Sequence, residues 1–138
     1  MNSLVRAGLL GAATGARSAT PLAALAAQGD NRWLKVFATA AAGGELIADK
    51  LPATPSRVKP APLTARIVTG AVAAGLDARR RGRGVAGPAL VGASAAAVAS
   101  YAGAWWRAFA THRGYATPAA LAEDGAAILL ATLGSSRR

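Results

Sequence analysis

The chain of 138 residues contains no cysteine, one histidine and only six acidic residues. Without cysteine it can form neither disulfides nor a thiolate site. The one imidazole, His112, stands beside Arg113 at the end of a helical segment, where an interfacial residue is expected rather than a metal ligand. The sequence also lacks a phosphate-binding G-x-x-x-x-G-K-[ST] loop and a nucleophile elbow. We therefore expect neither an enzyme nor a cofactor site.

The shortage of acids leaves a strong positive charge, because 16 Lys and Arg give a formal net charge of +10. Basic residues along one face of a soluble helix would predict a nucleic-acid partner. Here they lie mostly between apolar segments, as at positions 32–35, 79–83 and 107–113. Such cations suit anionic lipid head groups, each contributing on the order of 1 kcal/mol near the surface. The predicted partner is a lipid bilayer, not a nucleic acid.

Hydrophobic residues make up 53 % of the chain and charged residues only 16 %, which leaves little for a soluble surface. The length suits one domain, so residues 1–138 are interpreted as a single integral membrane domain. The alternative is an alanine-rich soluble helical bundle, because alanine is nearly neutral for membrane insertion and the mean hydropathy is only +0.31.

The most informative stretch is residues 84–106, which run for 23 positions without a charge. That is enough helix to cross a hydrocarbon core about 30 Å thick. Basic and aromatic residues bound it, as expected at membrane interfaces: Arg79, Arg80, Arg81, Arg83, Trp105, Trp106 and Arg107. The run therefore predicts a spanning helix.

Five apolar segments, separated by turn or charge signals, are expected to be helical: residues 3–28, 33–50, 63–78, 84–112 and 117–134. We predict an all-α, polytopic helical membrane protein with four or five transmembrane segments in the inner (plasma) membrane. Lys and Arg divide nine to six between the two sides of this arrangement, which favours a cytoplasmic C-terminus.

Two local signals bear on where these helices begin. The linker at 51–62 contains four prolines and is expected to be non-helical and outside the hydrocarbon. Thr117 followed by Pro118 is expected to cap and open the last helix, which Gly134 and the two following serines close.

The first segment is not expected to be a simple span, because Arg6 and Arg17 divide it into two short charge-free pieces. Thr20 and Pro21 are expected to restart a helix as its cap and first residue. We therefore predict a broken segment, whose two half-helices could form a re-entrant hairpin. The alternative is a full span with Arg17 facing the protein interior. Arg17 also interrupts what would be the apolar region of a signal peptide, so the segment is interpreted as part of the fold.

Small residues recur at four-residue spacing in three of the segments, as at Gly11 and Gly15, Gly70 with Ala74, and Gly92 with Ala96. This spacing lets helix backbones approach closely, which matters in lipid because apolar burial does not drive helices together. The spacing is interpreted first as packing between helices of one chain, and one of these faces could also support homo-oligomerisation.

Ionisable residues within apolar segments are the candidate site, because such groups are costly in a bilayer unless they are paired or hydrated. Glu45 and Asp49 share one helix face, with Lys50 adjacent, and Glu45 lies about 18 Å along its helix. Glu123 and Asp124 lie about 9 Å into the last helix. Because these two helices should run in opposite directions, both acidic clusters are expected in the same half of the membrane.

Arg17 is the expected counter-charge for Glu45 or Asp49. Asp77 is expected to be an interfacial partner of Arg80 or Arg81. A broken or small-residue segment precedes an acid-bearing helix at both ends of the chain, a pattern that suggests an inverted repeat of the kind found in transporters.

Two functional hypotheses follow. In the first, the chain is a small channel or transporter for protons or cations, whose pathway passes the four carboxylates. In the second, it is a non-transporting structural or lipid-interacting protein whose buried ion pairs lock the bundle. An accessory subunit of a membrane complex is a third possibility.

Four stretches, GAATGARSATPLAALA, GELIADKLPATPSR, ARIVTGAVAAG and AEDGAA, together resemble a family of small bacterial multi-pass membrane proteins classed only as a domain of unknown function. The most specific matches lie in the second stretch: Gly44, Glu45, Asp49, Lys50, Pro52, Pro55 and Arg57. The resemblance implies an integral membrane location and no established activity. GELIADK is also similar to the E-x-G-D-K-[TS] signature of a cation and proton exchanger family, although its carboxylates are four apart instead of three.

Overall fold

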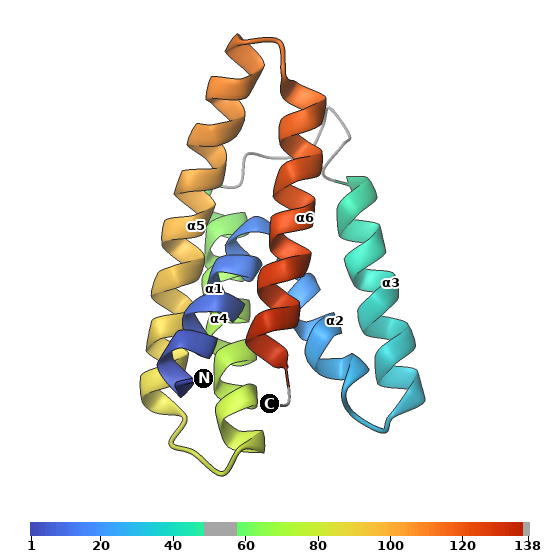
Figure 1. Cartoon of the computed structure of the whole chain (residues 1–138), viewed down its shortest axis with the longest axis vertical. Coiled ribbons are helices and arrows are strands. Elements are labelled where there is room, and N and C mark those ends of the chain that lie inside the picture. The colour runs from blue at the N-terminus through green and yellow to red at the C-terminus, as the bar shows by residue number, and fades with distance from the viewer. Residues whose placement is uncertain (49–57, 137–138) are drawn as a thin grey trace.

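The computed structural model describes residues 1–48 and 58–136, with the backbone alone for residues 45–48. These residues form six helices and no strand (Figure 1). The helices are α1 (Ser3–Ala16), α2 (Thr20–Ala27), α3 (Arg32–Ala48), α4 (Pro60–Arg80), α5 (Ala86–His112) and α6 (Ala116–Ser135). The expected all-α class is therefore confirmed, and each predicted apolar segment contains a helix.

The first segment is broken, as the alternation of charge and cap signals predicts. The helix α1 ends at Ala16 because Arg17 has an extended backbone, with φ −145° and ψ 109°. Pro21 stands in the first turn of α2, where its missing N–H costs no hydrogen bond. Between the two helices the chain reverses, and α2 returns toward the end of the bundle from which α1 came (Figure 1). A single continuous helix over this segment is excluded.

Two predicted helix starts are wrong by a few residues. The helix α4 already begins at Pro60, so the last part of the proline-rich linker is helical, since proline is tolerated in a first turn. Thr117 does not cap α6, which starts one residue earlier with Tyr115 at the N-cap. There Gly114, at φ +76°, turns the chain, and the Tyr115 N–H donates to the carbonyl of Ala110.

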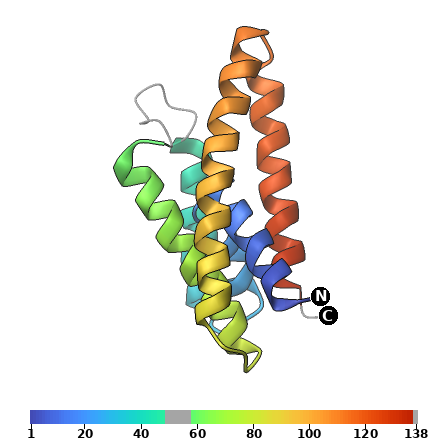
Figure 2. The ribbon, with the colours of Figure 1, turned by 90° about the vertical axis from the view of Figure 1, so that its left-hand side faces the viewer.

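Helices α1, α4 and α5 pack closely together, α6 lies along α1, and α3 packs mainly on α2 (Figures 1 and 2). One end of the bundle holds both termini together with the α2–α3 and α4–α5 connections, and we call it the terminal end. At the other end, α5 and α6 continue as a hairpin past the remaining helices. α3 and α6 run in opposite directions, as expected. The predicted inverted repeat makes the first segment equivalent to α5. The first segment is broken into two helices, whereas α5 is one continuous helix.

The interior is built from glycine and alanine. A Cβ atom at Gly15 would lie 2.6 Å from the carbonyl oxygen of Ala96, and one at Gly70 would lie 2.7 Å from that of Gly92. Such distances are too short for real side chains, so backbone packs on backbone where α1 and α4 meet α5. The four-residue spacing thus serves packing within one chain, and an oligomer would have to use another surface.

The exterior carries the large apolar side chains. Trp33 and Phe37 on α3 are 69 % and 70 % exposed, and Leu90 and Val98 on α5 are 70 % and 69 % exposed. Of the described helices only α6 is both long and apolar enough to cross a bilayer by those criteria alone. The predicted run at 84–106 lies almost entirely within one helix, α5, but that helix does not meet these criteria. Four or five spans are therefore not supported by length and composition.

Candidate functional site

The break after α1 places Arg17 in the middle of the bundle. Its side chain is 1 % exposed, and its Nε lies 2.9 Å from Oδ1 of Asp124 on α6. Its Nη2 donates to the same carboxylate oxygen. Because Arg17 leaves the helical path, its side chain can reach across to α6 instead of following the α1 surface. A predicted site residue from the first segment thus meets one from the last.

Arg66 on α4 supports the same break, and the sequence analysis missed it. It is buried, and its Nη1 lies 2.8 Å from the carbonyl oxygen of Gly15 and 3.4 Å from that of Thr14. The Ser100 hydroxyl on α5 lies 3.4 Å from the Gly15 oxygen, although its shorter hydrogen bond, at 2.8 Å, goes to the carbonyl of Ala96. The last carbonyls of a helix lack partners within it, so Arg66 on α4 satisfies the end of α1. The available signal was a single arginine inside an otherwise apolar segment.

Glu123 and Asp124 are neighbours on α6, but they bind different helices. Oε2 of Glu123 accepts a hydrogen bond of 2.8 Å from Nε of Arg107 on α5. Both carboxylates are buried, whereas Arg107 remains 31 % exposed. From the sequence, these two acids are expected within the last helix, where a carboxylate needs a partner or hydration, and each has an arginine partner.

A third cluster closes the terminal end. Asp77 on α4 receives hydrogen bonds from Nε of Arg6 at 3.2 Å and from Nε of Arg81 at 3.1 Å. Arg6 and Arg81 both also donate to the carbonyl oxygen of Ser136, the latter at 2.8 Å. The predicted pairing of Asp77 with Arg81 is confirmed. Asp77 is buried rather than interfacial, and its second partner, Arg6, was not predicted.

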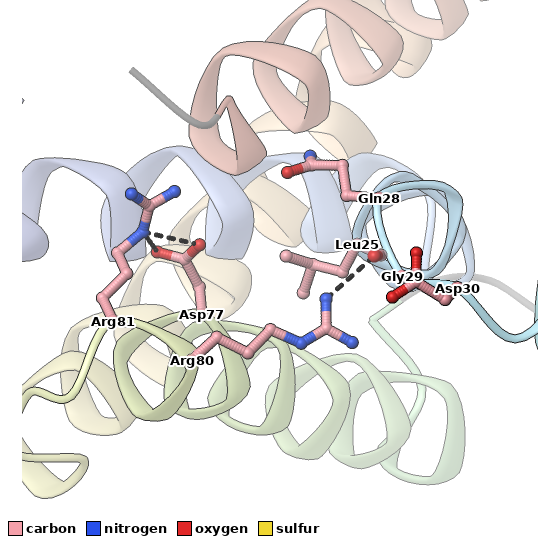
Figure 3. A pocket seen from close by; sticks show the side chains of 7 residues that line it. All are labelled: Leu25, Gln28, Gly29, Asp30, Asp77, Arg80 and Arg81. Carbon is pink, nitrogen blue, oxygen red and sulfur yellow. Dashed lines mark hydrogen bonds and ion pairs between the residues drawn. The ribbon is translucent and has the colours of Figure 1, made fainter.

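Arg80 has a different role from its neighbour. Its Nη1 donates to the carbonyl oxygen of Leu25 on α2 at 2.8 Å, so it does not bind Asp77 as the alternative prediction had it (Figure 3). It thereby joins the end of α4 to the end of α2.

The remaining predicted site residues are not tested. Glu45 belongs to α3, but its side chain lies outside the described part of the chain, as do Asp49 and Lys50 entirely. The expected pairing of Arg17 with Glu45 or Asp49 remains a prediction. What is established is a partner for Arg17 that the sequence did not suggest, Asp124.

The chemistry of this core is that of ion pairing. Each of the three buried carboxylates at positions 77, 123 and 124 accepts a hydrogen bond from at least one arginine. Within the described residues no group of three or more His, Cys, Asp or Glu could hold a metal ion. In the same part of the chain no buried side-chain nitrogen or oxygen lacks a hydrogen-bond partner. A satisfied arrangement of this kind joins helices rigidly.

Comparisons with protein-family models, with curated proteins and with solved structures gave no match. The functional argument therefore depends on the arrangement of the residues themselves.

Proposed function

We propose that the chain is a helical integral membrane protein of the inner (plasma) membrane, in which buried arginine–carboxylate pairs hold the bundle together and the outer surface contacts lipid. The observation that carries this proposal is the distribution of side chains. Small residues and the ion-paired carboxylates lie inside, and most large apolar residues lie outside, with Leu10 and Leu25 as the buried exceptions.

Water would disfavour this distribution and a bilayer would favour it. A soluble protein buries Leu, Phe and Trp, because removing apolar surface from water is its main stabilising term. In lipid the outer surface is already in an apolar medium, so helices associate through close packing of small residues and through polar contacts. Charged residues in such proteins face the bundle interior and pair with one another. The glycine contacts of α5 and the Arg17–Asp124 pair fit this description.

The proposed arrangement is polytopic, with α6 as its most apolar span. The α1–α2 reversal is a re-entrant hairpin in this proposal, with the satisfied carbonyls of α1 at its tip. Exposed or partly exposed arginines concentrate at the terminal end, where they favour a cytoplasmic position for both termini and could meet anionic head groups: Arg32, Arg79, Arg80, Arg81 and Arg83.

Labelling of single cysteines tests this topology without background, because the natural chain has no cysteine. Gly84→Cys and Ser136→Cys should react with a membrane-impermeant maleimide from the same side, and Thr111→Cys, near the α5–α6 turn, from the opposite side. Carbonate at high pH should leave the protein in the membrane pellet. Labelling of all three positions from one side, or release by carbonate, would contradict the proposal.

Within this location, the favoured function is structural and lipid-interacting. The supporting observation is that the buried carboxylates at 77, 123 and 124 are all engaged by arginine, which stays charged at any physiological pH. A carboxylate whose oxygens already accept hydrogen bonds from a guanidinium is less available to a transported cation.

The second candidate is a channel or transporter for protons or cations. Two adjacent carboxylates buried in α6, the one described helix long and apolar enough to span a bilayer, favour it. Glu45 and Asp49 would extend the pathway. Flux into proteoliposomes separates the candidates. Proton or cation flux through the natural protein that Glu45→Gln abolishes, with unchanged thermal stability, would establish transport. Equal absence of flux in both proteins would support the structural role.

A further inference from the structure

Two cavities meet at Arg80 on the terminal end. The first is a groove of about 320 Å³ between α2, α3 and α4, with almost entirely apolar walls. The second is a polar pocket of about 430 Å³ around the α2–α3 connection and the end of α4 (Figure 3). Leu25 and Arg80 line both cavities, so the groove and the pocket are adjacent, with these two residues between them.

The groove has a direction. From Arg80 it extends along α3 from Leu34 to Ala41, about 10 Å at the rise of an α-helix, and ends near Ala19 at the start of α2. Its far part contains no charged residue, and Phe37 and Leu22 form its sides. The apolar groove therefore begins at the terminal end and continues toward the middle of the bundle.

The side chains that line the polar pocket include two arginines and two aspartates, and the buried Arg6 behind Asp77 adds a third positive charge. Arg80 uses one donor on the Leu25 carbonyl, and a guanidinium has five, so it can bind a further acceptor. Asp77 is shared by Arg6 and Arg81, which leaves this cluster with one excess positive charge. Adding Arg80 and the exposed Asp30 keeps the total at +1. Gln28 supplies a neutral amide at the rim, as Figure 3 shows.

From this juxtaposition we infer that the site holds one molecule of an anionic phospholipid, with its phosphate on Arg80 and an acyl chain in the groove. The inference rests on the proposed membrane location. An amphiphile is indicated because an apolar groove adjoins a polar pocket whose charged groups, with Arg6 behind them, sum to +1. A single negative phosphodiester balances the +1 charge, and its oxygens suit a guanidinium fork. The terminal end is also where head groups would lie.

Lipid titration of the purified full-length chain tests the inference. In a neutral detergent, native mass spectrometry should show one phosphatidylglycerol retained per chain and little phosphatidylcholine at equal concentration. Arg80→Gln should weaken phosphatidylglycerol binding by about fivefold, the effect of one cation at an anionic surface. The matched control, Arg83→Gln, removes the same charge from an exposed residue that lines neither cavity, and should change binding by less than about twofold. Equal effects of the two variants would overturn the site and leave only general attraction to the basic end.

A second pair of variants tests the apolar half. Ala38→Phe fills the groove and should displace the acyl chain, whereas Ala40→Phe, at an exposed position that does not line the groove, should leave binding unchanged. Glycerol 1-phosphate, which has the head group but no tail, should not compete. Competition by glycerol 1-phosphate, or no effect of Ala38→Phe, would overturn the role of the groove.

A variant at Asp30 distinguishes an anionic head group from one that carries an amine. Asp30→Asn should strengthen phosphatidylglycerol binding, because it removes a negative charge near the phosphate. Tighter binding of phosphatidylethanolamine than of phosphatidylglycerol, weakened by Asp30→Asn, would overturn the anionic assignment in favour of an amine head group. The lipid site and the membrane location can fail separately. Carbonate-resistant protein that retains no selected lipid contradicts only the site, and protein released by carbonate contradicts the membrane proposal.

Discussion

The core formed by α1, α4 and α5 and the arm formed by α2 and α3 use opposite kinds of side chain. In the core, Gly15 and Gly70 lie against the backbone of α5, and buried arginines bridge the helices. The arm has few such contacts: α3 packs mainly on α2, and Trp33 and Phe37 point outward. The core is thus held by close contact between helix backbones, whereas the arm exposes large apolar side chains to the surrounding medium.

The difference indicates where a substitution should matter. In the core, added volume has no room, and a lost charge leaves its partner buried. On the arm, a change of an exposed apolar side chain alters mainly the contact with the surrounding medium and with the groove between α2, α3 and α4. Four variants, from the largest expected effect to the smallest, test this contrast.

Gly92→Leu should cause the largest loss of stability. A side chain at Gly92 would meet the carbonyl of Gly70 and, at 2.6 Å, the Cβ of Ala74, and α1 closes the other side through Gly11. Overpacking usually costs about 1 to 3 kcal/mol, and here the neighbouring atoms are mostly backbone, so we expect more than this and little folded protein. Thermal unfolding in detergent and yield after gel filtration measure it.

The matched control for that variant is Gly125→Leu on α6, where nothing lies within 4 Å of an added Cβ. It should be neutral or stabilise the helix by up to about 1 kcal/mol, since leucine has the better helix propensity. Similar losses for the two leucine variants would show that the core is not closely packed.

Arg17→Ala should be the next most damaging change. It leaves the Asp124 carboxylate buried without this partner, and breaking such a pair costs about 3 to 5 kcal/mol. Adding Asp124→Ala should recover part of the loss, because the coupling energy belongs to the pair. Unfolding midpoints of the two single variants and the double variant give the coupling directly. Purely additive losses would mean that Arg17 and Asp124 do not interact.

Arg107→Gln should cost about 1 kcal/mol or less. Its guanidinium binds Glu123 but remains 31 % exposed, so solvent screens the interaction and the glutamine amide can still donate a hydrogen bond. The measurement is the same unfolding midpoint, compared with Arg17→Gln as a buried counterpart. A loss as large as that of Arg17→Gln would show that Arg107 is also shielded from solvent in the native setting.

Phe37→Leu should have the smallest effect, within about 0.5 kcal/mol, because its ring is 70 % exposed and makes few contacts within the bundle. Unfolding midpoint and membrane retention should both match those of the natural chain. A loss comparable with that of Arg107→Gln would mean that α3 packs against a further surface, such as a second protein.

Much of the helix pattern could be predicted from the sequence, because charges, prolines and glycines interrupt its apolar runs locally. Arg17, Thr20 and Pro21 are consecutive signals, so the break between α1 and α2 could be predicted from them. The number of spans could not, because alanine is nearly neutral between water and lipid. An alanine-rich run therefore predicts a helix more surely than it predicts a membrane.

The pairing inside the site was beyond sequence reasoning for a different physical reason. Burial of an arginine in an apolar segment predicts that it needs a partner, but helix periodicity relates only residues a few positions apart. Arg17 and Asp124 are 107 positions apart and meet only through the packing of α1 on α6. Arg66 binds backbone carbonyls rather than an acid, so a search for opposite charges could not find its role.

Arg6 and Arg17 are far from their partners along the sequence, so their ion pairs can form only late in synthesis. Arg6 precedes Asp77 by 71 residues, and Arg17 precedes Asp124 by 107. At ribosomal rates of about 5 to 20 residues per second, Arg17 waits about 5 to 20 s before its carboxylate has been made. Both arginines lack their carboxylates until Asp77 has been made, and Arg17 alone lacks its partner from then until Asp124 has been made. In the proposed membrane location, the first hairpin can meanwhile settle only against head groups, water or the insertion machinery. Its final position is therefore reached after translation of the last helix, so truncation before α6 should leave the N-terminal hairpin unassembled.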